Sequence, residues 1–359
     1  MKKTLLGAAL TAAATNCAWA QTSSVQLYGI VDIGVISDKT EGQKARNAID
    51  NALWTPSRFG LRGQEQLTSD SKAFFVLENG FAPDTGTATL GGRLFGRSAY
   101  VGIENRNWGE LRAGRSMHFS QLWAPVIASP FILGMGRNSA GTTLAFDDDS
   151  FGNGRVDNAV YYVSPSFSGL QVGAGYSFNI GTALPGATAT AEVPGTRNNN
   201  RLIDSAVRYT NGPLSAVVAY MRTQVADSAT AQRDPSSLIA AASYNFGIAR
   251  VHAAFGSLKN SQSEPSGRAV TTTGWLTAAR NGDKAYSLGV SVPVGGGEIK
   301  ASFQKTTSSK ITSYGAGYFY SLSKRTALYA FWNDGETRDF VRNEDVSRRQ
   351  LAVGVSHIF

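Results

Sequence analysis

The clearest pattern along the chain is an alternation of apolar and polar residues in short segments. In residues 297–304, Ile299, Ala301 and Phe303 lie on one face and polar residues on the other. The same period of two recurs in three further segments, at residues 170–178, 250–256 and 285–293. A period of two is typical of β-strands with one apolar and one polar face. The chain is therefore predicted to be all-β.

Turn-forming residues separate these strands, and the connections alternate between two lengths. Short turns are predicted at residues 68–70, 105–107, 166–169, 211–213, 247, 294–296 and 323–325. Long loops are predicted at residues 37–52, 82–94, 116–153, 179–200, 224–236, 258–282 and 334–346, with a shorter one around 307–309. Short turns at one rim and long loops at the other are typical of an up-and-down transmembrane β-barrel. The strands number about sixteen, an even count that such closure requires.

The first 20 residues have the pattern of a cleaved signal peptide. Lys2 and Lys3 precede an apolar stretch, and Ala18-Trp19-Ala20 supplies a small-x-small cleavage pattern. Periodicity alone does not say whether the apolar strand faces point inward, as in a soluble sandwich, or outward, as in a membrane barrel. Export and a chain that ends on Phe359 favour the barrel. We predict a signal peptide at residues 1–20 and a single transmembrane antiparallel β-barrel domain at residues 21–359.

Aromatic residues gather near the predicted strand ends, where a membrane barrel carries its interfacial girdles. The residues expected in these girdles are Tyr28, Trp54, Tyr162, Tyr176, Phe178, Tyr209, Tyr220, Tyr244, Phe246, Tyr318, Tyr320, Phe331, Trp332 and Phe359. The alternative is that these are ordinary half-buried strand aromatics.

Composition narrows the classes of protein that fit. The chain has a charged fraction of 17% and 39 glycines, which suits strands with one polar face joined by many tight turns. Its mean hydropathy of −0.16 excludes a helical membrane protein. The one cysteine, Cys17, lies in the leader, which leaves no thiol for disulfides or metal. Without Lys2 and Lys3, 32 of the 34 basic residues remain against 26 acidic ones, a charge of +6. With no basic run, recognition-helix pattern or zinc spacing, we expect neither nucleic acid nor a cofactor as a partner.

The third long loop, at residues 116–153, is out of proportion to the others. About 39 residues lie between Arg115 and Arg155, which flank this loop. A loop already needs a functional explanation when it is longer than ~12–15 residues. Its first part, residues 124–136, is unusually apolar, so we expect it to fold inward against the barrel wall; the alternative is packing on a neighbouring subunit. Its far end carries Asp147, Asp148 and Asp149, which lack the spacing of a known calcium loop. No metal is therefore expected.

Four arginines are predicted to face the lumen. Arg58 and Arg62 share one face of a strand whose other face is apolar, while Arg97 and Arg155 begin two later strands. A guanidinium on the lipid face costs about 2–4 kcal/mol near the bilayer midplane, so all four side chains should point inward. Arginines facing the acidic residues of the third loop would set up a transverse field across weakly screened water. Such a pore constriction filters solutes by size and charge.

Six motifs carry a resemblance to a known family, at residues 25–32 (VQLYGIVD), 57–65 (SRFGLRGQE), 96–102 (GRSAYVG), 112–115 (RAGR), 158–169 (NAVYYVSPSFSG) and 353–359 (VGVSHIF). They resemble the Gram-negative general diffusion porins, in particular their β-proteobacterial branch, over the whole mature chain. The resemblance implies a homotrimer of 16-stranded barrels in the outer membrane, each with the third loop folded into its lumen. Outer-membrane lipid and lipopolysaccharide are then the expected surroundings.

The resemblance also assigns roles by position. Three residues match the family's constriction arginines, namely Arg58, Arg97 and Arg155. The family's loop-three carboxylates fall on the acidic run Asp147, Asp148 and Asp149. Phe359 resembles the C-terminal signal that the barrel assembly machinery of the outer membrane reads.

The function expected from these features is a water-filled pore for passive diffusion of small hydrophilic solutes and ions, leaning toward anions. A substrate-specific channel for phosphate, an organic acid or a sugar on the same barrel is the alternative. A barrel enzyme of the lipase or protease type would need a nucleophile oriented by a base. The chain has three histidines, and a lone Ser116-x-His118 in a loop is a weak signal, so no enzyme activity is expected.

Overall fold

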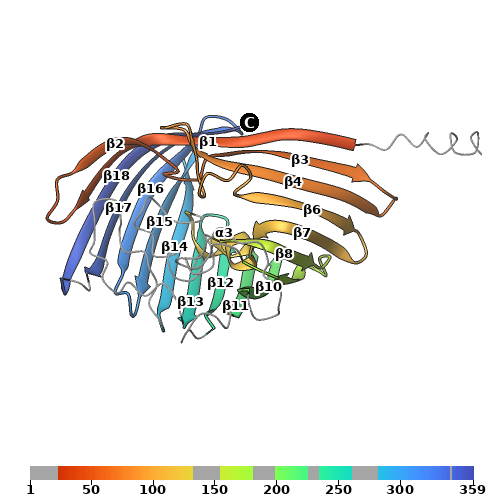
Figure 1. Ribbon diagram of the computed structural model, residues 1–359. Helices are drawn as coiled ribbons and strands as arrows, with labels where there is room; N and C mark the ends of the chain where they lie inside the picture. Colours follow the sequence, from red (N-terminus) through yellow and green to blue (C-terminus); the bar gives the residue numbers. More distant parts are fainter. Residues whose placement is uncertain (1–22, 132–153, 181–198, 225–233, 261–281, 340–341) are drawn as a thin grey trace, which may run out of the picture.

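The computed structural model describes residues 23–131, 154–180, 199–224, 234–260, 282–339 and 342–359 (Figure 1). The strands of the first half are β1 (Ser23–Thr40), β2 (Arg46–Asn51), β3 (Arg58–Gln66), β4 (Ser71–Ala82), β5 (Thr87–Ala88), β6 (Ser98–Asn105), β7 (Gly109–Met117), β8 (Arg155–Val163) and β9 (Leu170–Ser177). The second half supplies β10 (Arg201–Asn211), β11 (Leu214–Gln224), β12 (Ser236–Asn245), β13 (Arg250–Lys259), β14 (Lys284–Val294), β15 (Gly297–Thr306), β16 (Thr312–Ser321), β17 (Thr326–Asp339) and β18 (Glu344–Ile358). Two short helices, α2 (Phe119–Trp123) and α3 (Pro125–Ala128), follow β7.

These strands form one closed antiparallel barrel. From β6 to β18 each strand pairs with the next one in sequence, and β3 pairs with β4, which pairs with β6 across the two-residue β5. The wall is closed by β1, which pairs with β2 and β3 on one side and with β18 on the other. Because β2 and β3 both pair with β1 and form a single wall strand, and β5 lies on a loop, the described wall has 16 strands. Within the described ranges, neither helix is long and apolar enough to cross a membrane. The predicted all-β barrel is confirmed.

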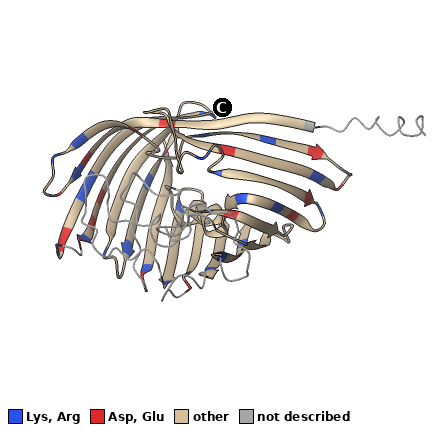
Figure 2. Cartoon of the chain, viewed as in Figure 1, with Lys and Arg blue, Asp and Glu red and all other residues tan. Residues whose placement is uncertain are grey.

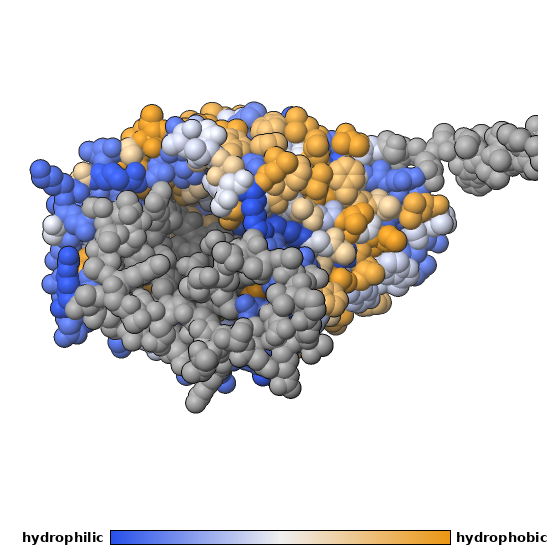
Figure 3. Space-filling model, viewed as in Figure 1, coloured by the Kyte–Doolittle hydropathy of each residue, from blue (hydrophilic) through white to orange (hydrophobic). Residues whose placement is uncertain are grey.

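The apolar faces of the strands point outward. In β14, Leu288 is 57% exposed, whereas Ser287 and Ser291 on the opposite face are buried inside the barrel. Charged residues interrupt the strands at few positions, and those of β3, β4 and β7 include both basic and acidic ones (Figure 2). Figure 3 shows apolar surface over the outer wall near β1, β3 and β4. This inside-out arrangement is stable only when lipid covers the outer wall. Strand periodicity left open whether the apolar faces point inward or outward, and the structure shows that they point outward, as in a membrane barrel.

The predicted turns agree with the structure at one rim and partly at the other. All seven short turns join consecutive strands, and their rim is here called the short-turn rim. The predicted loops at residues 37–52 and 334–346 are wrong, because β1, β2, β17 and β18 continue through most of both ranges. Beyond the apolar band these strands lose their alternating pattern but keep their backbone ladder, and a buried ion pair between Arg348 and Asp38 joins β18 to β1.

Three residues of the predicted girdles lie inside the barrel instead. Tyr28 donates a hydrogen bond to Glu78, and Trp54 packs against Phe319 with ring centroids 4.8 Å apart. Phe331 is buried in the same inner cluster as Phe319. Sequence spacing placed these aromatics near strand ends, but strand parity turns Tyr28 and Phe331 inward, and Trp54 belongs to the irregular segment between β2 and β3.

The C-terminal residue completes the barrel wall. The Phe359 N–H donates to the Gly29 carbonyl (3.0 Å), and the Gly29 N–H donates to the Phe359 carbonyl (3.1 Å). The Phe359 ring lies where a side chain at position 29 would project, since a Cβ there would come within 2.3 Å of Phe359 Cζ. Phe359 thus extends the contact between the first strand, β1, and the last strand, β18.

Candidate pore constriction

The start of the third long loop folds into the barrel (Figure 1). Its helices α2 and α3 lie against the inner faces of β10–β14. The Phe119 N–H donates to Asp204 Oδ2 on β10 (2.8 Å), and His252 Nδ1 on β13 lies 3.0 Å from the Ile127 carbonyl oxygen. The expectation that this loop folds inward is therefore confirmed for residues 118–131, which narrow the lumen from one side.

Glycines on the inner wall receive the bulky residues of this loop. A Cβ at Gly173 would lie 2.3 Å from Cζ of Phe119, and one at Gly289 would lie 2.4 Å from Cδ of Pro130. Phe119 is fully buried and also packs against Trp123 and Tyr161, with ring centroids 4.6 and 5.3 Å apart. A larger residue at either glycine would push the loop away from the wall and toward the centre of the lumen. These glycines therefore determine how closely the loop packs against the wall.

Two of the predicted arginines meet at one carboxylate. Arg97 Nε lies 2.6 Å from Glu78 Oε1, and Arg58 Nε lies 3.7 Å from Glu78 Oε2. Tyr28 donates to the same Oε2 (3.0 Å). One carboxylate between two guanidinium groups leaves this cluster with a net positive charge. We call it the Glu78 cluster.

Sequence reasoning missed Glu78. It occupies the inward-facing parity of β4, in register with Gly60 on β3 and Ser98 on β6, which places it between Arg58 and Arg97. That parity was the available signal, because a carboxylate on the inner face of a wall strand needs a cationic partner.

The two remaining predicted arginines lie elsewhere. Arg155 is buried at the start of β8, in register with Met117, and the preceding Gly154 accepts a hydrogen bond from the His118 N–H (3.3 Å). Arg155 therefore lies beside the start of α2. Arg62 lies on β3, four residues nearer the short-turn rim than Arg58, and its guanidinium donates to Gln26 Oε1 (2.7 and 2.9 Å). The predicted acidic run at residues 147–149 is outside the described residues.

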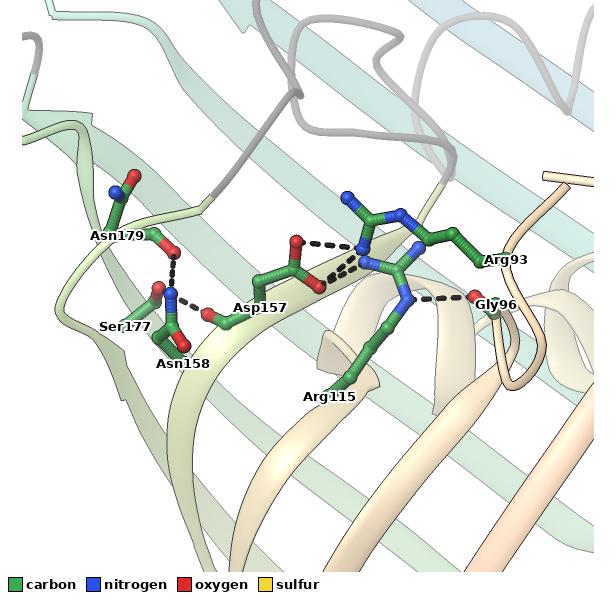
Figure 4. Close-up of polar contacts among 7 residues, drawn as sticks. All are labelled: Arg93, Gly96, Arg115, Asp157, Asn158, Ser177 and Asn179. Atoms are coloured by element: carbon green, nitrogen blue, oxygen red, sulfur yellow. Dashed lines mark hydrogen bonds and ion pairs between the residues drawn. The ribbon is translucent and has the colours of Figure 1, made fainter. Parts of the chain in front are cut away.

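A second ion cluster, also missed by sequence reasoning, ties a loop to the barrel wall (Figure 4). Asp157 on β8 accepts two hydrogen bonds from Arg93 (2.8 and 3.0 Å), which belongs to the loop between β4 and β6. Arg115 on β7 pairs with the same carboxylate and donates from Nε to the Gly96 carbonyl (2.7 Å). The Ser177 hydroxyl donates to the Asp157 carbonyl (2.7 Å). Three separate segments of the chain are therefore held at Asp157.

Replacing Asp157 with alanine is expected to release the loop that carries Arg93. The substitution leaves Arg115, which is 14% exposed, without its carboxylate, and breaking a largely buried pair costs about 3–5 kcal/mol. Limited proteolysis of the folded barrel should then cleave within residues 83–97 faster than in the wild type. Asp70→Ala, which removes an exposed carboxylate at a short turn, is the matched control. Equal cleavage rates in all three proteins would contradict the role of Asp157.

Among the residues that the structure describes, no hydrogen bond joins a histidine to a serine as a nucleophilic pair. His118 Nδ1 accepts the Gln121 N–H (3.3 Å) as the cap of α2, and the Ser116 hydroxyl donates to the Met117 carbonyl (3.4 Å). His357 Nδ1 lies 2.9 Å from the Thr326 hydroxyl on the neighbouring strand. In the described part of the chain no group of three or more histidine, aspartate or glutamate side chains could hold a metal ion.

A closed barrel with an apolar outer wall, a polar lumen and the start of a loop folded into that lumen defines a transmembrane pore protein. The sequence profile of the Gram-negative porin family matches residues 7–339, and the chain belongs to this family. It is a channel of the outer membrane, and its family is one of porins rather than of enzymes.

Individual relatives agree with this assignment. The chain is 34% identical to an outer membrane porin protein of Bordetella pertussis, with 100% of both chains covered. It is also 34% identical to outer membrane porin protein 32 of Delftia acidovorans, over 97% of this chain and 91% of the relative. Among solved structures, an anion-selective porin from Comamonas acidovorans superposes with a TM-score of 0.71 at 28% identity, covering 94% of this chain and 100% of that one. The expected family and fold are confirmed.

Proposed function

We propose that this porin is a passive diffusion channel that favours small anions, with Arg58, Arg97 and Arg155 as the cations of its constriction. The observation that carries the proposal is the Glu78 cluster, in which two guanidinium groups share one carboxylate at the inner wall. An unbalanced positive charge beside confined water lowers the energy of a passing anion and raises that of a cation. The anion selectivity of the similar Comamonas acidovorans porin supports the same direction.

The remaining predicted residues extend this filter. Asp147, Asp148 and Asp149 would supply the opposing negative charge from the third loop. Arg62, nearer the short-turn rim and on the inward parity of β3, would draw anions toward the constriction after they pass the rim.

The assembly we propose is a homotrimer, embedded in outer-membrane lipid and lipopolysaccharide. Residues 1–20 would direct export and then be removed, and Phe359 would serve the barrel assembly machinery as its recognition signal. Support for the trimer comes from the family resemblance, and an outer membrane protein of Vibrio cholerae with a similar fold was solved in a trimer form.

Planar-bilayer recording of the mature protein tests these proposals together. We expect ohmic current that rises in groups of three equal steps, and a reversal potential of the sign for anions across a KCl gradient. A cation-type reversal potential would overturn the proposed filter while leaving the pore intact. Single, independent steps would overturn the trimer.

A further inference from the structure

A cavity of about 450 Å³ lies in the barrel beneath α3, toward the short-turn rim. Ser129 and Pro130 at the end of α3 border it, and the inner faces of β13–β15 with the turn between β12 and β13 complete it. Figure 1 shows α3 beside these strands, which lie across the lumen from β3 and β4. The volume is in the range of pockets that hold small solutes. The cavity is therefore a place distinct from the Glu78 cluster.

Two basic side chains line the cavity, and they differ in exposure and in their ion pairs. Arg250, the first residue of β13, is exposed and forms no side-chain hydrogen bond or ion pair with any residue that the structure describes. Lys300 on β15 is instead held by Glu298, with Nζ 3.1 Å from Oε2, and lies over the Phe319 ring at 4.7 Å. The charge available to a solute is therefore that of Arg250, with a carboxylate nearby.

Neutral donors complete the lining. Ser291 is buried and in register with Arg250, and Asn245 ends β12 opposite Arg250 in the same hairpin. His252 lies two residues further along β13 on the same face, and its Nδ1 already contacts the Ile127 carbonyl oxygen of the third loop. A solute in the cavity would thus meet the guanidinium of Arg250, the amide of Asn245 and the hydroxyl groups of Ser291 and Ser129.

We propose that this cavity is a binding station for small organic monocarboxylates on the short-turn side of the constriction. A guanidinium group presents two parallel N–H donors that match the two oxygens of a carboxylate. Ser291 and Asn245 can donate to its remaining lone pairs or to hydroxyl groups of the same solute. Because Glu298 neutralises Lys300, the cavity offers one positive charge, so the second negative charge of an anion such as phosphate would lose water without gaining a partner. The inference depends on the proposed function only in needing an open lumen.

Block of the channel by gluconate, a monocarboxylate, tests the station. Planar-bilayer currents in KCl are recorded while gluconate is added to each side in turn, and the half-blocking concentration is measured. We expect block from one side, and a half-blocking concentration roughly tenfold higher in Arg250→Gln, because a charge-assisted hydrogen bond is lost. Lys72→Gln is the matched control, since it removes one positive charge near the same rim from the opposite wall. It should behave as the wild type does.

Each other outcome overturns the inference. Absence of gluconate block, or equal block in the wild type and Arg250→Gln, would mean that the cavity binds no carboxylate. Stronger block by phosphate than by gluconate would assign a different class of anion. Glu298→Gln offers a second check, because it should strengthen block by phosphate relative to gluconate. Failure of the proposed function is separable, because it would change the reversal potential measured before any gluconate is added.

Discussion

Replacing Arg97 and Arg155 with glutamine is expected to remove most of the anion preference of the channel. Arg97 is nearly buried and bonded to Glu78, so its loss changes the net charge of the Glu78 cluster from positive to neutral. Arg155 is buried beside α2, where the third loop narrows the lumen. Both substitutions therefore remove positive charge from the narrow part of the lumen, where an ion must pass close to the wall.

The size of this effect follows from the charge removed. Each guanidinium is worth on the order of 1 kcal/mol to an anion a few ångströms away in water, which corresponds to roughly a fivefold change in relative permeability. The ratio of chloride to potassium permeability, obtained from the reversal potential across a KCl gradient, should fall by roughly 25-fold in the double variant, because the two fivefold factors multiply. Heat-modifiability on gels would confirm that the variant barrel is folded.

A matched control and an opposite change sharpen the test. Lys324→Gln with Arg325→Gln removes two charges from an exposed short turn and should leave the permeability ratio unchanged. Glu78→Gln removes the carboxylate and should raise the anion preference. A permeability ratio that is the same in the wild type and in Arg97→Gln with Arg155→Gln would remove these arginines from the filter without affecting the fold.

Replacing Phe119 with alanine is expected to detach the start of the third loop from the barrel wall. Phe119 is fully buried in the recess above Gly173 and packs against Trp123 and Tyr161. Truncating a buried phenylalanine costs about 3–5 kcal/mol. The wall keeps its backbone ladder, because Phe119 belongs to α2 and to no strand. We therefore expect a folded barrel with a larger single-channel conductance and more frequent current fluctuations.

The recess offers an independent way to move the same loop. Gly173→Ala places a methyl group 2.3 Å from the Phe119 ring and should raise current noise without removing any aromatic contact. Leu122→Ala, on the exposed side of α2, is the control and should conduct as the wild type does. Wild-type conductance and noise in Phe119→Ala would show that the loop is held by other contacts, such as the hydrogen bond to Asp204.

The sequence alone predicted the barrel, its strand number and the short turns. Strand alternation and turn residues are local properties, and a membrane barrel pairs strands in chain order, so the local pattern was enough to specify the topology. The same reasoning failed at residues 37–52 and 334–346, where paired strands continue outside the apolar band. A backbone ladder needs no alternation of side chains, so the pattern gave no signal there.

Inward arginines were predictable from the cost of placing a guanidinium against lipid, but their partners were not. Glu78 lies 19 residues from Arg97, and Asp157 lies 64 residues from Arg93, and these groups meet only through strand register and the path of a loop. The recess that holds Phe119 likewise depends on a glycine two strands further along the wall. What the sequence determined was therefore the strand order and the inward direction of the arginines. Only the tertiary structure decided which charges neutralise one another, because that depends on distances between segments far apart in the chain.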